Sequence, residues 1–191
     1  LLVNAQTHSG DVGAAGDTLA HMLAELARSG NDHNRALGET MAASRAALVG
    51  AIDEAERHLG RARQFAGPSP RPSLIASLRG SEAAIAVGRG DEAEAARLFR
   101  LQLGGRPVDE GRQRYGNVRR LTLLYVLLPE TRERFTADAV GPCYQPGLAL
   151  ARALVTLRES SDVAEAAHLT PAAWGAAPAF LPTSWIVELA T

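Results

Sequence analysis

The chain has 191 residues, of which 46% are hydrophobic and only 5% aromatic, so it is long and apolar enough to bury a core. Its formal net charge of −1 gives no global attraction to nucleic acid or anionic lipid, and we predict no direct contact with either. The single cysteine, Cys143, excludes an internal disulfide, and no apolar run approaches the roughly 20 residues of a membrane span. These features predict a cytoplasmic protein without a membrane segment.

Abundant alanine and few aromatic residues favour closely packed helices, because small side chains let helix axes approach. The best strand candidate, Leu121 to Leu128, runs into Pro129 without a hairpin signal, so we predict an all-α fold. The predicted helices span residues 11–28, 32–49, 51–66, 72–88, 91–103, 108–128, 129–139 and 145–159. Further helix starts are predicted at Asp162 by a capping box with Glu165, and before Pro171 and Pro182.

A spacing of 40 residues recurs through the first two thirds of the chain. It is carried by three columns, which are Gly10, Gly50 and Gly90, then Ala15, Ala55 and Ala95, then Leu19, Leu59 and Phe99. A glycine can adopt the left-handed conformation that ends a helix, and Asp91 is placed to cap the helix that follows. We expect the alanine where two helices cross and the larger residue on the same apolar face.

The segment Gly90, Asp91, Ala95 and Phe99 resembles the second half of a tetratricopeptide repeat, and residues 49–62 resemble it more closely. The spacing of 40 exceeds the usual period of about 34, and the linker 67–72 can hold part of the excess. The resemblance implies a right-handed solenoid of antiparallel helical hairpins over residues 1–128, followed by an irregular helical cap over 129–191.

Residues 120–191 resemble the helical region of large actinobacterial transcriptional regulators, in the run 123–132 and in Leu181-Pro182-x-x-Trp185. In that family the region accompanies an NTPase or DNA-binding module, which the resemblance places outside this chain. Both ends of the sequence read as if inside a helix, so we expect a portion of a longer protein.

No pattern in the sequence predicts catalysis, a cofactor or a metal ion. The five histidines form no His-x-x-x-His pair, Cys143 lacks a helper motif, and no phosphate loop or nucleophile elbow is present. The acidic residues Asp53, Glu54 and Glu56 lie in the first turn of a predicted helix, where they complement the helix dipole. An all-α enzyme would require a closed pocket that holds His33 or Glu39 beside a second acid.

In tetratricopeptide stacks the first helix of each pair lines a concave groove, and the resemblance carries that role onto equivalent positions here. Counting back from the turn glycines gives Thr40, Ser44, Ala47, Ser77, Ala84 and Val87, and a further step of 40 gives Asn117, Arg120 and Leu124. Arg112 belongs to an arginine-rich run at 106–120 that would make one end of this groove basic. The candidate partner-binding residues are therefore Thr40, Ser44, Ser77, Arg112, Asn117 and Arg120.

The expected function is that of a non-catalytic scaffold that binds a protein or peptide segment, or other domains of a parent protein. The alternative is a module that senses a small molecule or a short peptide in the concave groove. A homodimer is left open by the sequence.

Overall fold

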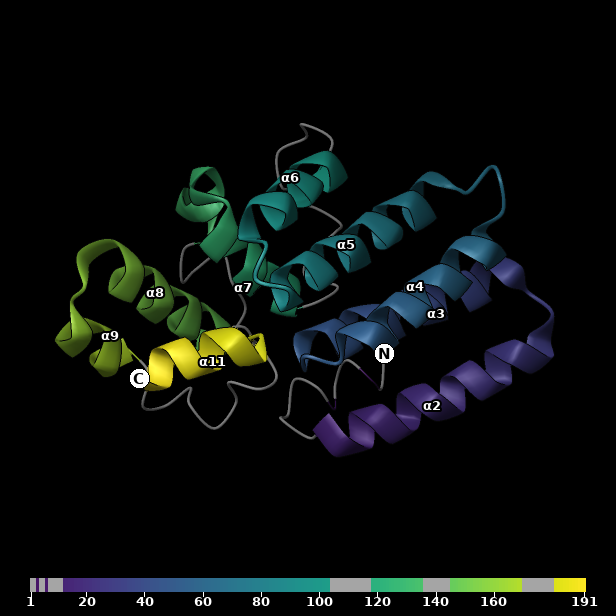
Figure 1. The fold of residues 1–191 in the computed structure, drawn as a ribbon, viewed down its shortest axis with the longest axis horizontal. Coiled ribbons are helices and arrows are strands. Elements are labelled where there is room, and N and C mark those ends of the chain that lie inside the picture. The colour runs from purple at the N-terminus through teal and green to yellow at the C-terminus, as the bar shows by residue number, and fades with distance from the viewer. Residues whose placement is uncertain (1–2, 4–5, 7–11, 104–117, 136–144, 170–180) are drawn as a thin grey trace. The chain divides into compact units, whose positions relative to one another are not determined.

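The computed structural model describes residues 12–103, 118–135, 145–169 and 181–191, together with Val3 and Gln6. Within these residues every regular element is a helix and no strand occurs, which confirms the all-α prediction. The chain divides into two compact units, and Figure 1 labels their helices. One unit comprises residues 13–106, and the other comprises 107–191 with 3–12.

Five helices form the first unit, and each predicted boundary lies within one residue of the observed one. They are α2 (Val12–Ser29), α3 (Asp32–Leu48), α4 (Ile52–Ala66), α5 (Pro72–Gly88) and α6 (Glu92–Leu103). Helix α3 packs against α4 and α5, and α5 in turn packs against α4 and α6. The start of α3 is capped by Asn31, whose side chain accepts a hydrogen bond of 3.1 Å from the backbone N–H of Asn34. Two successive helical hairpins are thereby joined through α3 and α5.

The two hairpin turns are built alike, 40 residues apart. Gly50 and Gly90 have φ angles of 84° and 78°, so both take the left-handed conformation expected for a turn glycine. The backbone N–H of Gly50 donates to the carbonyl of Ala47 over 3.1 Å, and that of Gly90 donates to Val87 over 2.9 Å. Asp91 accepts a hydrogen bond of 3.0 Å from the backbone N–H of Glu94, which confirms its predicted capping role.

The small and large residues of the repeat columns are buried. Ala15, Ala55 and Ala95 are all 0% exposed, and the apolar column of Leu19, Leu59 and Phe99 is 2–6% exposed. Close approach of the helices explains the small residues. A Cβ atom added to Gly88 of α5 would lie 2.7 Å from the backbone carbonyl oxygen of Ala47 in α3, which leaves no room for a larger residue.

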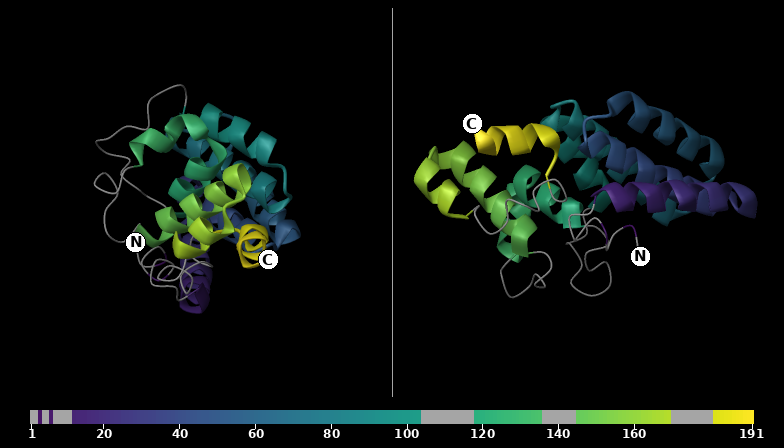
Figure 2. Two further views of the ribbon diagram at one scale, coloured as in Figure 1. Left: turned by 90° about the vertical axis from the view of Figure 1, so that its left-hand side faces the viewer. Right: turned by 90° about the horizontal axis from the view of Figure 1, so that it is seen from below.

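The second unit contains shorter elements. They are α7 (Val118–Leu127), the 3-10 helix η1 (Pro129–Arg134), α8 (Gln145–Ser160), α9 (Val163–Leu169) and α11 (Thr183–Ala190). Helix α8 packs against α7, α9 and α11, and Figure 2 shows α11 alongside it. The prediction of a helix over 129–139 is corrected, because residues 129–134 wind as a 3-10 helix that begins at Pro129. The predicted start before Pro171 and residues 108–117 of the helix predicted at 108–128 lie outside the described residues.

The sequence signals for α9 and α11 are found in the structure. Asp162 accepts a hydrogen bond of 2.9 Å from the backbone N–H of Glu165, so it caps α9 as predicted. Pro182 directly precedes α11. None of the described helices combines the length and the apolar character needed to cross a membrane.

Candidate functional site

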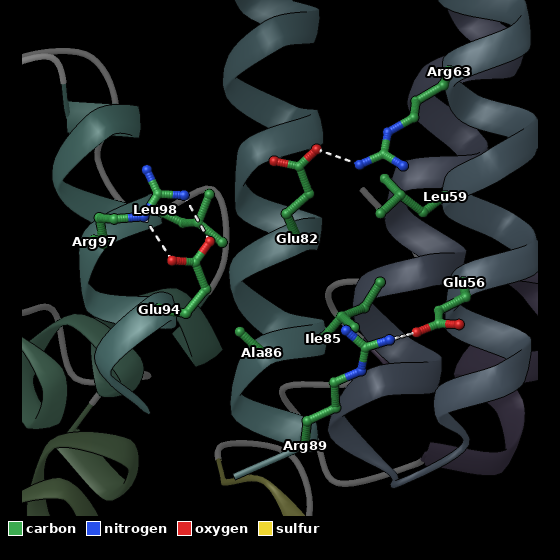
Figure 3. Close-up of a pocket in the computed structure, with 10 residues that line it drawn as sticks. All are labelled: Glu56, Leu59, Arg63, Glu82, Ile85, Ala86, Arg89, Glu94, Arg97 and Leu98. Carbon is green, nitrogen blue, oxygen red and sulfur yellow. Dashed lines mark hydrogen bonds and ion pairs between the residues drawn. The ribbon is translucent and has the colours of Figure 1, made fainter. Parts of the chain in front are cut away.

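A groove of about 590 Å³ lies on the first unit, across helices α4, α5 and α6 (Figure 3). It is lined by Glu56, Leu59, Arg63, Glu82, Ile85, Ala86, Arg89, Glu94, Arg97 and Leu98. Both α4 and α6 are second helices of their hairpins, with α5 between them. The groove therefore uses the second helices α4 and α6 as well as the first helix α5, whereas the resemblance places the binding surface on the first helices alone.

The floor of the groove is apolar. Leu59 from α4, Ile85 and Ala86 from α5, and Leu98 from α6 are each 4–8% exposed, so only narrow parts of these side chains face the hollow. Leu59 belongs to the apolar column at 40-residue spacing, whose members are all buried. The floor is thus the outer edge of the hydrophobic core.

The rim consists of three carboxylates and three guanidinium groups, and all six are paired with one another. Arg63 donates to Glu82 over 2.7 Å and Arg89 donates to Glu56, so both of these pairs join α4 to α5. The third pair lies within α6, where Arg97 donates to both oxygens of Glu94 over 2.6 Å. Figure 3 shows the three pairs around the apolar floor. A ligand with a single charge must therefore compete with an existing pair.

The pair within α6 also changes the ionisation of its members. The hydrogen bond from Arg97 holds the pKa of the Glu94 carboxyl below its ordinary value, and the same bond raises the pKa of Arg97. The charged forms of both groups are therefore favoured, and the rim keeps this pair at neutral pH.

Two of the predicted partner-binding residues, Thr40 and Ser44, lie in the packing between α3 and α5, and a third, Ser77, bonds within α5. Thr40 is 4% exposed, and its carbonyl accepts a hydrogen bond of 2.9 Å from the hydroxyl of Ser81. Ser44 donates to the same Ser81 hydroxyl over 3.1 Å, and Ser77 donates to the carbonyl of Ser73 over 3.1 Å. The structure gives Thr40 and Ser44 a role in joining the two hairpins, and none of the three lines the groove over α4, α5 and α6.

Most of the other predicted positions are either buried or outside the described part of the chain. Ala47, Ala84 and Val87 are at most 2% exposed and Leu124 is 3% exposed, so all four belong to cores. Arg112 and Asn117 lie outside the described residues. Arg120 lies in α7, and the position of its side chain is not described. A basic end of a concave groove stays a prediction.

A polar cluster centred on two largely buried side chains joins α3 to α4. The Nδ1 atom of His58 lies 2.6 Å from Oε2 of Glu39, and both side chains are 12% exposed. Arg61 places its Nε atom 3.1 Å from the same oxygen, and Glu54 lies 3.6 Å from the Nε2 atom of His58. Glu39 thus has His58 and Arg61 beside it, and the cluster does not line the groove. No group of three or more histidine, cysteine, aspartate or glutamate residues in the described ranges could hold a metal ion.

Sequence reasoning does not identify the groove when each of its residues is interpreted alone. Glu56 was attributed to the helix dipole, and the arginines of α4 and α5 carried no prediction. Spacing held the missing signal, because Glu56 and Arg63 are seven residues apart in α4, and Glu82 and Arg89 are seven apart in α5. Residues seven apart lie two turns along one helix face, so each pair predicts a charged frame around an apolar centre.

Comparison with protein-family models, curated proteins and solved structures found no match to this chain.

Proposed function

We propose that this chain is a non-catalytic helical-repeat scaffold that mediates protein–protein or interdomain interaction. The observation that carries the proposal is the groove over α4, α5 and α6, which combines an apolar floor with a rim of mutually paired charges. An apolar side chain from a partner can cover the floor without breaking these pairs. It would also exclude water from them, and a lower local dielectric strengthens each ion pair.

The two joined hairpins support the tetratricopeptide-like part of the proposal. The turn geometry and the hydrogen bonds at Gly50 recur at Gly90, as expected of repeated units that stack to bury one continuous core. Repeat arrays of this kind expose extended surfaces that bind partner segments. The resemblance of residues 120–191 to actinobacterial regulators is the reason to propose a transcriptional regulator as the setting.

A displayed library of amphipathic helical peptides tests the scaffold function. Peptides of about 20 residues span about 30 Å as a helix and are selected on the immobilised chain. We expect the recovered peptides to bind wild type and to lose at least about tenfold in affinity for Arg89→Glu, which places a negative charge beside Glu56. Arg57→Glu is the matched control, because Arg57 is an exposed residue of α4 that does not line the groove. Peptides that bind both variants equally would place the interaction elsewhere and contradict the proposal.

A second candidate function is the sensing of a small molecule or short peptide. The groove volume of about 590 Å³ favours it, since ligand pockets commonly measure about 300–1,000 Å³. Thermal-shift screening against metabolites and short peptides separates the two functions. A saturable rise in Tm with one metabolite, absent in Arg89→Glu and kept in Arg57→Glu, would favour the sensor, whereas the scaffold predicts no rise with any metabolite.

A further inference from the structure

Helices α4 and α5 carry the same eight-residue pattern, Glu-x-x-Leu/Ile-x-x-x-Arg. It is formed by Glu56, Leu59 and Arg63 in α4 and by Glu82, Ile85 and Arg89 in α5. All six residues line the groove. In both helices the apolar residue lies between the two charges on the same face, because offsets of three, four and seven residues keep side chains together on a helix.

The two copies of the pattern run in opposite directions across the groove. Arg63 therefore lies beside Glu82 at one end, with 2.7 Å between the paired atoms, and Glu56 lies beside Arg89 at the other end. Figure 3 shows these four side chains as the corners of a frame around the floor. Neighbouring corners have opposite charges along each helix and also across from one helix to the other.

A frame with this alternation is complementary to a copy of itself. When a second frame is turned face to face about a two-fold axis that lies in the plane of the frame and runs along or across the helices, each corner meets the neighbour of its own equivalent. With the axis along the helices, Glu82 meets Arg63 of the second copy, and with the axis across the helices it meets Arg89 of the second copy. Both contacts join opposite charges, and two-fold symmetry makes every such contact twice.

We propose that a second copy of this chain docks on the groove, with its α4 and α5 facing the α4 and α5 of the first. The inference deepens the proposed function, on which it rests, by naming the partner of the groove. The apolar residues Leu59 and Ile85 lie at the centre of the resulting contact and the charged frame surrounds them. Interfaces commonly have this arrangement of an apolar core within a polar rim.

Charge complementarity selects a second copy over other occupants. An acidic segment or a basic segment would meet two corners of like charge and two of opposite charge, so its net attraction to the frame is small. A second copy turned about an axis along or across the helices meets an opposite charge at each of the four corners. The existing pairs also survive, because a carboxylate accepts through two oxygens and a guanidinium has five N–H donors, so each pair can extend into a four-membered network.

Exposure of the frame leaves its side chains free to form such networks. Arg63 and Arg89 are 58% and 57% exposed, and Glu56 is 44% exposed. Each of these residues therefore reaches beyond the floor while it remains paired. The contact predicts an association that weakens as salt is added, since exposed ion pairs are screened.

The first experiment measures the oligomeric state of the whole chain by sedimentation velocity. We expect a dimer that dissociates between about 1 and 100 μM and dissociates more readily at high salt. Arg89→Glu, which introduces like-charge contacts twice in the dimer, is expected to raise the dissociation constant at least about tenfold. Arg57→Glu makes the same change of charge on α4 outside the groove and is expected to leave the dissociation constant within about twofold. Circular dichroism checks that both variants remain helical.

The second experiment inverts the whole frame with Glu56→Arg, Arg63→Glu, Glu82→Arg and Arg89→Glu in one chain. The two ion pairs of the frame are kept with their charges exchanged, and circular dichroism checks that the inverted chain remains helical. The inverted chain is complementary to itself under either two-fold axis and is repelled by wild type under both. We expect it to dimerise with an affinity close to that of wild type and to form no mixed dimer, as measured by native mass spectrometry of a tagged mixture.

Three outcomes would overturn the proposal. These are a wild-type chain that is monomeric throughout the concentration range, a dimer that is unaffected by Arg89→Glu, and free mixing of inverted and wild-type chains. None of them removes the scaffold function, because peptides selected on the monomer can still bind the groove. Conversely, a dimer with the expected charge dependence stands even where the peptide library yields no binder.

Discussion

The hairpins α3 to α6 and the region that contains α7 to α11 are both helical, and arginine ion pairs join helices in both, but only the hairpins have a core with 40-residue spacing. In the hairpins, helices approach closely over small residues at regular positions, and Ala55 and Ala95 are both 0% exposed. The turns between the helices use glycines of positive φ at 40-residue spacing. Packing in the hairpins depends on this periodic pattern, so the same arrangement of small and apolar residues occurs in both hairpins.

In the region from α7 to α11, individual arginines join elements that share no period. Arg158 of α8 donates through two nitrogens to Glu188 of α11 over 2.6 Å, and its guanidinium lies 5.2 Å from the ring centroid of the buried Trp185. Arg132 of η1 donates to the backbone carbonyl of Tyr125 over 2.9 Å and to Glu159 over 2.7 Å. A guanidinium suits this role, since it has several donors and a flat face.

The two regions are expected to tolerate different substitutions. A periodic core of alanine fails when a residue becomes larger, because neighbouring backbones have no room to move apart. A region joined by a few large side chains fails when one of them is removed. We therefore expect opposite sensitivities, and the following variants test them from the largest expected effect to the smallest.

Removal of Trp185 is the largest expected loss. The side chain is 2% exposed and anchors α11, so Trp185→Ala is expected to cost about 3–5 kcal/mol, as large aromatic truncations in cores do. Hydrogen–deuterium exchange should show residues 183–190 losing protection. Val187→Ala is the control, because Val187 is 56% exposed on the same helix and its truncation should change little. Equal protection in both variants would contradict an anchoring role for Trp185.

Enlargement of Ala55 tests the hairpins, where a larger side chain rather than a smaller one is expected to destabilise. Ala55→Leu places three more carbon atoms at a site that is 0% exposed, and we expect a destabilisation of about 1–3 kcal/mol. Urea denaturation followed by circular dichroism measures it. Ala93→Leu is matched to it, since Ala93 is exposed on α6 and leucine is a comparable helix former. An Ala55→Leu chain as stable as wild type would contradict the expected sensitivity of the hairpins to larger side chains.

The sequence predicted the hairpins well because their determinants are local or periodic. A turn glycine, a capping aspartate and a small residue at a helix crossing each act on neighbours that the spacing specifies, as at Gly90, Asp91 and Ala95. The boundaries of α2 to α6 were therefore predicted to within one residue.

The charge spacing within α4 and within α5 is visible in the sequence, but their meeting with α6 in one groove joins residues that are distant in the chain, as the arginine contacts do. Arg158 and Glu188 are 30 positions apart, and no short pattern specifies their meeting. Likewise, the burial of Thr40 follows from the packing of α5 on α3, which a single repeat does not reveal. The 3-10 helix at 129–134 was predicted as part of an α-helix because proline is compatible with the first turn of either.

Two glycines of one hairpin, Gly50 and Gly60, test whether the turn requires a glycine. Gly50 has φ of 84°, so Gly50→Ala forces a side chain into the left-handed region and should destabilise by about 1–2 kcal/mol. Gly60 lies inside α4 with open space where a Cβ would stand, so Gly60→Ala should stabilise by about 0.5–1 kcal/mol. Thermal denaturation of both variants measures the difference. Changes of the same sign would show that the turn glycine is not required for its conformation.

The smallest expected effect concerns Glu94 and Arg97, an arginine pair inside the repeated hairpins. If periodic packing holds that region, loss of the pair should leave Tm almost unchanged while the ionisation of Glu94 changes. The hydrogen bond from Arg97 lowers the pKa of Glu94, so whatever the pair contributes is present above the unfolded-state pKa and is lost as pH falls through the lower folded-state value. A pH titration followed by NMR should therefore give Glu94 a pKa that rises in Arg97→Gln. A large fall in Tm in that variant would mean that the hairpins depend on this arginine contact within α6 as well as on periodic packing.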